Sequence, residues 1–260
     1  MMQFKELPYW HSNVETPTIP LLDIPKEVDV AIVGAGFTGL ATALHLLRGG
    51  KSVALFDAMT LGEGASGKNG GMIGPSLHKL GLDGLTDTYG KDKAIDILQE
   101  GMTAIQYFQE FVKDENIDCD LAMTGRLRGV TNQKALDGVL RDSEKLKALK
   151  GFKFDAVKKE NIQGEIGSDL YQGGVIYHQD GGVHPQKLVL ALAQKVISLG
   201  GTIHQKTLVG DITKTPTGFQ IETAKNPLVA GNVVIASNGY TKKFSNGKLP
   251  YFYKRLLPIT

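Results

Sequence analysis

The sequence predicts an α/β fold in which a Rossmann-like domain is interleaved with an α+β lobe. Three observations carry this prediction. Residues 29–58 have the order strand, glycine turn, helix, strand, with glycines at the spacing G-x-G-x-x-G. A second glycine-rich segment, residues 61–76, follows directly. After a mostly helical stretch, the Rossmann-like alternation of helix and strand resumes at about residue 181.

Residues 30–33 predict the first strand, since a continuous apolar run is typical of a strand buried on both faces. Gly34, Gly36 and Gly39 follow it. In this spacing the first glycine allows the tight turn out of the strand, and the second lets the backbone approach a pyrophosphate. The third lets the helix pack close to the sheet. The three glycines therefore indicate a phosphate-bearing ligand.

The predicted helix has one apolar face and ends at the Gly49-Gly50 pair. That face consists of Leu40, Ala43, Leu44 and Leu47. Ser52–Phe56 predicts the next strand, and Asp57 stands at its end, where a carboxylate accepts hydrogen bonds from ribose hydroxyls. Strand, turn, helix and acid in this order predict a dinucleotide-binding site. The alternative is an empty Rossmann-like unit in which the glycines serve only packing.

The second glycine-rich segment favours a flavin over a nicotinamide. Its glycines are too frequent for an ordinary helix or strand, and they are Gly62, Gly64, Gly67, Gly70, Gly71 and Gly74. Ser66, Lys68 and Asn69 add a hydroxyl, a cation and an amide, so the segment predicts a polyanion cradle that faces the cofactor. A nicotinamide enzyme needs no second glycine-rich segment here, whereas the ribityl chain and ring of a flavin can use one. The alternative is a flexible surface loop.

The two motifs, residues 34–40 (GAGFTGL) and 64–71 (GASGKNGG), resemble those of the D-amino-acid-oxidase (DAO) superfamily of FAD enzymes. The most similar branch holds gamma-glutamylputrescine oxidase and the deaminating glycine and D-amino-acid oxidases. Residues 8–10, 181–187 and 233–241 resemble segments of that branch in the same order, so the resemblance covers essentially the whole chain. Lys68 departs from the branch, which has arginine there, and this puts a bidentate pyrophosphate contact in doubt.

The resemblance implies FAD as the cofactor and implies which residues bind it. It places the backbone of Val209 against the adenine, and it closes the turn at residues 237–239 over the cofactor. The alternatives are a strand core for Val209 and a plain turn at Asn238-Gly239. The implied cofactor-binding residues are Gly34, Gly36, Phe37, Thr38, Gly39, Asp57, Ala65, Ser66, Lys68, Asn69, Gly70, Gly71, Val209, Ser237 and Asn238.

The remaining chain predicts two interleaved domains. Periodicity predicts helices at residues 91–116, 133–149 and 185–199, and strands at 171–178, 203–212, 219–223 and 232–236. Residues 1–88 and 181–243 are expected to form a Rossmann-like FAD/NAD(P)-binding domain. Residues 89–180 and 244–260 are expected to form a substrate-binding lobe.

Composition excludes several function classes. A net charge of +2 over 260 residues argues against a nucleic-acid partner. No run of 18 apolar residues predicts a transmembrane segment. Cys119 is the only cysteine, so no disulfide forms within the chain and a reducing, cytoplasmic location is expected. No metal site is expected, because none of the six histidines has a metal-ligand or triad pattern around it.

The predicted function is FAD-dependent oxidation of the CH–NH bond of an amine or amino acid. Hydride transfer to flavin gives an imine that hydrolyses to an aldehyde or oxo acid, and oxygen reoxidises the flavin to give hydrogen peroxide. No catalytic residue is predicted, since the flavin does the hard chemistry. The open alternatives are an FAD-dependent dehydrogenase with an electron carrier, an NAD-dependent dehydrogenase and an inactive flavin-binding fragment.

The superfamily's members are markedly longer, and we expect the chain and its substrate-binding lobe to be incomplete at the C-terminus. The closing segment Leu249–Thr260 is apolar and aromatic, like a strand entering a sheet whose partners are absent. The alternative is that this segment docks as the last strand of a complete small domain.

Overall fold

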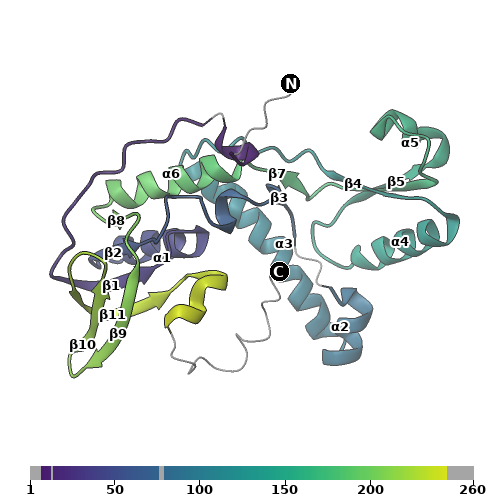
Figure 1. The fold of residues 1–260 in the computed structure, drawn as a ribbon. Coiled ribbons are helices and arrows are strands. Elements are labelled where there is room, and N and C mark those ends of the chain that lie inside the picture. The colour runs from purple at the N-terminus through teal and green to yellow at the C-terminus, as the bar shows by residue number, and fades with distance from the viewer. Residues whose placement is uncertain (1–6, 13, 76–78, 245–260) are drawn as a thin grey trace. The chain divides into compact units, whose positions relative to one another are not determined.

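The computed structural model describes residues 7–12, 14–75 and 79–244 of the 260-residue chain (Figure 1). The chain divides into two compact units. Unit 1 comprises Met1–Gly70 and Pro185–Thr260, and unit 2 comprises Gly71–His184. Unit 2 is therefore an insertion into unit 1 along the chain.

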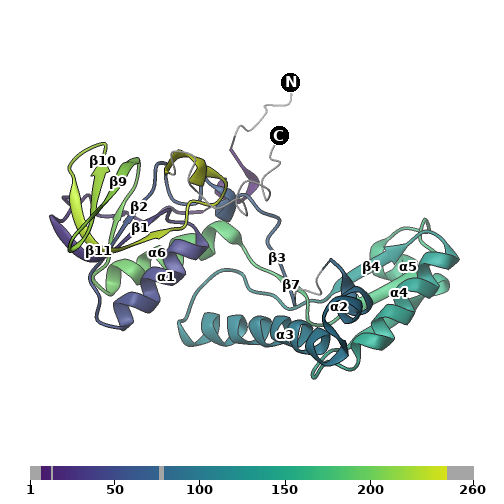
Figure 2. The same ribbon diagram turned by 90° about the horizontal axis from the view of Figure 1, so that it is seen from below.

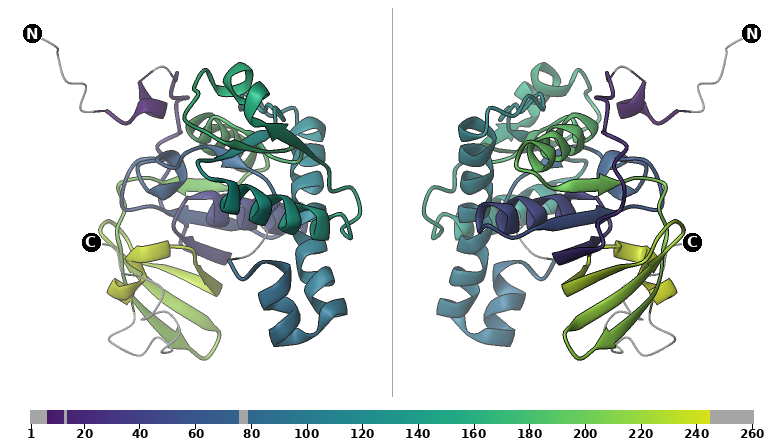
Figure 3. Two further views of the ribbon diagram at one scale, coloured as in Figure 1. Left: turned by 90° about the vertical axis from the view of Figure 1, so that its right-hand side faces the viewer. Right: turned by 90° about the vertical axis from the view of Figure 1, so that its left-hand side faces the viewer.

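Unit 1 is built on a six-stranded sheet whose central strands are parallel. The strand order is β8 (Thr202–His204), β2 (Val53–Phe56), β1 (Glu27–Val33), β11 (Leu228–Ile235), β10 (Gly218–Thr223), β9 (Val209–Thr215). Strands β8, β2, β1 and β11 run parallel, and β9, β10 and β11 form an antiparallel meander, green to yellow in Figure 3. The predicted α/β fold class is confirmed.

Both faces of this sheet are covered by apolar packing. Helices α1 (Phe37–Arg48) and α6 (Pro185–Ser198) lie side by side on one face (Figure 2). Leu40 of α1 and Val189 of α6 are fully buried there. On the other face, Val33 and Phe56 pack in a cluster with Ile221 of the meander. Each such aliphatic or aromatic side chain contributes roughly 1.5–3 kcal/mol when fully buried, so apolar packing on both faces stabilises the sheet.

Unit 2 contains two small antiparallel sheets and four helices among its described residues. One sheet pairs β3 (Met72–Ile73) with β7 (Gly181–Gly182), and the other has the order β4 (Arg126–Val130), β6 (Gly173–Tyr177), β5 (Phe154–Lys158). The helices are α2 (Gly81–Tyr89), α3 (Lys91–Asp114), α4 (Gln133–Leu146) and α5 (Lys159–Ile166). Its own core joins Leu85 of α2, Leu98 of α3 and Val175 of β6.

The units divide the chain at different residues from the domains that the sequence predicts. The contact boundaries lie at 70/71 and 184/185 rather than at 88/89 and 180/181. The first difference arises because Leu85 of α2 is buried in the core of unit 2. The functional division into an FAD-binding domain and a substrate-binding lobe stays a proposal. The predicted terminal strand Leu249–Thr260 lies outside the described residues.

One predicted strand is wrong in its extent. Residues 203–212 form two strands, β8 and β9, because the chain turns between them. Lys206 adopts a positive φ of 50°, its backbone N donates to Met59 O, and Thr207 N donates to Asp57 O. Residues 206 and 207 therefore form backbone hydrogen bonds with the residues that follow β2, and this interrupts the predicted strand. Within the described ranges, no helix has the length and apolar character needed to cross a lipid bilayer.

Candidate dinucleotide site in unit 1

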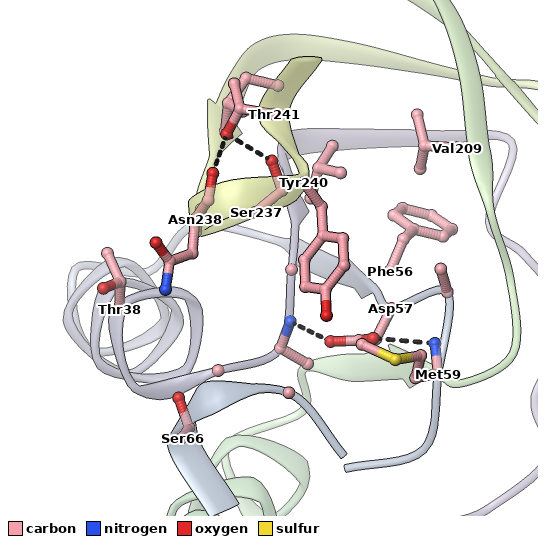
Figure 4. A pocket seen from close by; sticks show the side chains of 18 of the residues that line it. Thr38, Phe56, Asp57, Met59, Ser66, Val209, Ser237, Asn238, Tyr240 and Thr241 are labelled. Atoms are coloured by element: carbon pink, nitrogen blue, oxygen red, sulfur yellow. Dashed lines mark hydrogen bonds between the residues drawn. The ribbon is translucent and has the colours of Figure 1, made fainter. Parts of the chain in front are cut away.

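A cavity of about 770 Å³ opens at the carboxyl ends of β1, β2 and β11 (Figure 4). Strands β2 and β11 flank β1 on opposite sides, so the cavity lies at the switch point of the sheet, where open α/β folds bind ligands. Its volume is typical of a small-molecule site. The lining residues are 33–38, 56–59, 62, 64–66, 207–209, 235–238, 240 and 241.

The turn after β1 and the start of α1 contain two positions, Gly34 and Gly39, at which any side chain would collide with the backbone. Gly34 has φ 106°, and a Cβ there would lie 2.5 Å from Ala236 O. The N–H of Gly34 donates to Phe56 O at 2.8 Å, which ties the turn to β2. A Cβ at Gly39 would lie 1.9 Å from Gly34 O, so helix α1 approaches the turn as closely as only glycine permits. These two glycines set the position of the start of α1.

Gly36 differs from these two because its backbone does not need glycine. It caps α1 with φ −81° and ψ −173°, an extended conformation open to any residue. A Cβ there would meet only the flexible hydroxyl of Ser66, at 2.8 Å from Oγ. Gly36 also lines the cavity. What glycine provides at this position is space on the cavity side of the helix start.

The N-terminus of α1 opens onto this cavity. Phe37 and Thr38, its first two residues, both line the wall. The helix has no capping side chain at Gly36, but Ser66 Oγ accepts a hydrogen bond from Phe37 N at 3.1 Å. A helix N-terminus combines unpaired N–H donors with the positive end of the helix dipole, which favours a bound anion. Ser66, from the second glycine segment, therefore lies where an anionic group would be bound.

Asp57 is held at the cavity wall by two backbone donors. Its Oδ2 accepts from Ala35 N and its Oδ1 from Met59 N, both at 2.9 Å (Figure 4). Each carboxylate oxygen has a second lone-pair site, so Asp57 can still accept from a ligand hydroxyl. The same carboxylate thereby links the turn after β1 to the segment after β2.

The opposite wall comes from the second half of unit 1. Val209 is buried at the start of β9, and Ser237 and Asn238 follow β11. The turn at 237–241 is held by hydrogen bonds between the two hydroxyls Ser237 Oγ and Thr241 Oγ1 at 2.9 Å, and from Thr241 Oγ1 to Asn238 O at 2.6 Å (Figure 4). Val209, Ser237 and Asn238, three of the residues that the resemblance implied, therefore all lie on the cavity wall.

Five residues of the implied set do not line the cavity. They are Gly39, Lys68, Asn69, Gly70 and Gly71. Gly39 is buried under the turn, Lys68, Asn69 and Gly70 are exposed, and Gly71 belongs to unit 2. Asn69 Nδ2 donates to Ser66 O at 2.9 Å, so its amide braces the segment that carries Ser66. Contacts of these five residues with the cofactor stay predictions.

Several residues of the cavity wall are outside the set that the resemblance implied, among them three with large or polar side chains. Met59, Thr207 and Tyr240 line the wall together with the predicted residues. Tyr240 projects its ring into the cavity from the turn after β11 (Figure 4). The only available signal for Tyr240 was its place in the segment 233–241. Met59 and Thr207 had none, because their positions depend on the tertiary pairing of residues 57–61 with 205–207.

His204, at the end of β8 next to the lining residue Phe56, has a shifted pKa. Burial lowers the pKa of its imidazole below the ordinary value. The ring stacks on Phe56 with centroids 5.0 Å apart, and the backbone O of His204 accepts from Asp57 N at 3.0 Å. In the described part of the chain, no group of three histidine, cysteine, aspartate or glutamate residues lies close enough to hold a metal ion.

The donor set fits a dinucleotide such as FAD. A helix N-terminus with a nearby hydroxyl suits a pyrophosphate, and a fixed carboxylate suits a ribose. The glycine-lined space at Gly36 leaves room for the phosphates to approach the backbone.

Known proteins are similar to this chain over most of its length. The family model described as FAD dependent oxidoreductase, DAO, matches residues 29–259. Gamma-glutamylputrescine oxidoreductase of Escherichia coli is 32% identical over 212 residues, which cover 82% of this chain and 49% of the relative. Probable oxidoreductase OrdL of Haemophilus influenzae is 28% identical over 254 residues, which cover 96% of this chain and 58% of the relative. The chain thus spans about half the length of the curated relatives it matches.

Solved structures share the fold. The crystal structure of glycine oxidase from Geobacillus kaustophilus matches with a TM-score of 0.72 at 24% identity, covering 84% of this chain and 57% of that chain. L-Amino acid deaminase from Proteus vulgaris, with a specific insertion sequence deleted, matches with a TM-score of 0.70 at 18% identity. That match covers 90% of this chain and 58% of the deaminase chain. At these identities the matches establish the fold.

Proposed function

The chain belongs to the DAO family of FAD-dependent oxidoreductases, and from this premise we propose that it oxidises the CH–NH bond of an amine or amino acid. The observation that carries the proposal is the cavity in unit 1, where the N-terminus of α1, Ser66 and Asp57 converge. The substrate class is supported by two relatives, whose names are gamma-glutamylputrescine oxidoreductase and glycine oxidase.

Each wall of the cavity has a role in holding FAD. The backbone N–H groups at the start of α1 and the hydroxyl of Ser66 would bind the pyrophosphate. Asp57 would accept from the ribose hydroxyls, and Val209 would lie against the adenine. The turn at Ser237-Asn238 would close over the bound cofactor. Bound FAD supplies the acceptor for the hydride that leaves the amine-bearing carbon.

The proposed reaction balances with water and oxygen. An amine, water and oxygen give an aldehyde or oxo acid, ammonia or a smaller amine, and hydrogen peroxide. The residues described here bind and orient the cofactor, and none is assigned a proton-transfer role. The acceptor is proposed to be oxygen, and the location is proposed to be cytoplasmic because Cys119 is the only cysteine.

The test is a cofactor titration followed by an acceptor comparison. Protein stripped of ligand and titrated with FAD should gain flavin absorption bands in the visible range, and NADH should not displace the flavin. Turnover is then measured over a panel of amines and amino acids, with peroxide release compared against reduction of an artificial electron acceptor. Peroxide release supports an oxidase. Reduction of the artificial electron acceptor without peroxide release would show that the protein is a dehydrogenase instead. A protein that binds NADH and ignores FAD would refute the proposal.

A further inference from the structure

Two glutamine side chains hold one residue of the second glycine segment, Leu61, through the two peptide groups on either side of it. The N–H of Leu61 donates to Gln205 Oε1 at 2.8 Å, and the C=O of Leu61 accepts from Gln186 Nε2 at 3.1 Å. Gln186 comes from α6, and Gln205 comes from the turn between β8 and β9. We name this pair of contacts the glutamine clamp. It joins Leu61 to two residues that follow more than 120 positions later in the sequence.

The Gln186 amide occupies space that glycines leave open. Gln186 is only 4% exposed. A Cβ at Gly62 would lie 1.8 Å from Gln186 Oε1, and one at Gly67 would lie 2.4 Å from the same atom. Gly62 also has φ 81°, so its peptide turns back under the amide. Two glycines of the segment thus serve the insertion of a buried polar side chain rather than general flexibility.

The clamp acts on the residue that meets the helix N-terminus. Ser66 lies between Gly62 and Gly67, which both pack against Gln186. Ser66 Oγ accepts from Phe37 N, the first residue of α1. If the backbone at Leu61 shifts, the turn that carries Ser66 loses its anchor. A displacement of about 1 Å at a site that positions a ligand is enough to weaken it strongly.

We infer that the glutamine clamp is a positioning device for the phosphate-binding hydroxyl of Ser66. This inference rests on the proposed function, since Ser66 is proposed to bind the FAD pyrophosphate. Gln186 and Gln205 touch no cofactor in this scheme: neither lines the cavity. They act through the segment 61–67, and the glycine-rich composition of that segment accommodates them.

The first test needs no cofactor. Gln186→Leu keeps the volume and removes the donor, and Gln194→Leu is the matched control, because Gln194 is exposed on the same helix. Hydrogen exchange of the ligand-free proteins should show faster exchange at residues 61–67 in Gln186→Leu and no change in Gln194→Leu. Unchanged exchange at 61–67 would overturn the clamp, whether or not the protein binds FAD.

The second test is a double-mutant cycle on FAD affinity. Gln186→Leu alone should weaken FAD binding by about tenfold, the loss expected when a displaced Ser66 hydroxyl no longer makes its hydrogen bond to the charged pyrophosphate. In a Ser66→Ala background the same change should weaken FAD binding by less than about threefold, because the hydroxyl that the glutamine clamp positions is already absent. Equal losses in both backgrounds would mean that Gln186 does not act through Ser66. Wild-type protein that binds no FAD refutes the proposed function instead, and the exchange measurement still decides the clamp.

A second pair of variants covers the case in which Gln186→Leu does not fold. Gln205 supplies an acceptor, so Gln205→Glu keeps the contact to Leu61 N and Gln205→Leu removes it. FAD affinity and exchange at 61–67 should be close to wild type in Gln205→Glu and impaired in Gln205→Leu. Equal impairment in both variants would contradict the inference, since a packing role alone does not distinguish them in this way.

Discussion

At the scale of single residues, Asp57 joins fold and function in one carboxylate. It accepts from Ala35 N and Met59 N and keeps acceptor capacity toward the cavity. Asp57→Ala should weaken FAD binding by on the order of 1.5–3 kcal/mol, since it removes a charged acceptor for a ribose hydroxyl. It should also lower the melting temperature, because two backbone donors lose their partner.

The control for Asp57 is Asp211→Ala, on the exposed part of β9 in the same unit. FAD titration and thermal melting of both variants separate the two effects. An Asp57→Ala protein with wild-type FAD affinity would contradict the ribose contact, even if its melting temperature falls.

His204 predicts how the stability of unit 1 depends on pH. Burial lowers the pKa of His204 in the folded protein, so the unfolded chain, with an ordinary pKa of about 6.5, binds the proton more readily. The contribution of neutral, buried His204 to the free energy of unfolding is therefore fully present above pH 6.5. It is lost as the pH falls through the pKa that His204 has in the folded protein. His204→Phe keeps a ring that can stack on Phe56 and removes the titration.

Urea unfolding at pH 7.5 and pH 5.5 measures this effect. The free energy of unfolding should fall more for the wild type than for His204→Phe on acidification. The same loss in both proteins would show that other groups dominate.

The residues that could be predicted from the sequence are those whose role in the backbone is marked by neighbouring residues in the chain. Gly34, Gly36 and Asp57 follow from spacing alone, because turn, helix start and strand end are adjacent in the chain. Gln186 and Gln205 could not be predicted, since both meet Leu61 only after the fold forms, more than 120 residues away in sequence. Lys68 has a charge that suits an anion, but the chain leaves it exposed outside the cavity wall.

At the scale of elements, the segment from β1 through the turn to α1 contains two kinds of glycine. Gly34 and Gly39 are needed for folding, whereas Gly36 leaves room for a ligand. Gly34→Ala forces φ 106° on a side chain and puts its Cβ 2.5 Å from Ala236 O. We expect a loss of stability of on the order of 1–3 kcal/mol for the strained backbone alone. Gly36→Val meets no backbone atom and pushes only on the hydroxyl of Ser66, so the ligand-free protein should lose less stability than Gly34→Ala while FAD binding is lost.

Thermal melting without ligand and FAD titration on the same samples test this contrast. Gly50→Ala, in the turn after α1, matches Gly34→Ala in its positive φ, and a Cβ there meets nothing within 4 Å. It should therefore show the strain without the steric contact. A Gly36→Val protein that binds FAD normally would mean that the turn does not approach the phosphates.

Elements with strong periodicity were predicted close to their observed bounds. Helix α3 was expected at residues 91–116 and lies at Lys91–Asp114, and α6 was expected at 185–199 and lies at Pro185–Ser198. The short elements α2, α5 and β5 were not expected, since few residues give a weak periodic signal. Strand β11 begins earlier than expected, at Leu228, because the start of its run pairs with both β1 and β10.

At the scale of the whole molecule, the sequence pattern predicts that one unit is inserted into the other. It does not predict the exact residues at which the insertion begins and ends. The change from Rossmann-like alternation to long helices predicted an insertion at residues 89–180, and the compact units place it at residues 71–184. Which unit a helix such as α2 joins depends on long-range burial of Leu85, which periodicity does not encode. The family match extends over both units, from residue 29 to residue 259.

The division into two units predicts where ligand stabilisation appears. Every residue that lines the cavity belongs to unit 1, and each unit has an apolar cluster of its own. ADP, which shares the pyrophosphate and adenosine of FAD, should therefore protect unit 1 selectively. At 100 times its dissociation constant it should stabilise that unit by about 2.7 kcal/mol. In hydrogen exchange, the slowest amides of β1, β2 and β11 should slow accordingly, while those of α3 and β6 in unit 2 change less. Gly36→Val, which removes the phosphate space, is the control and should show no ADP effect. An equal slowing in both units would show instead that they unfold as one cooperative body.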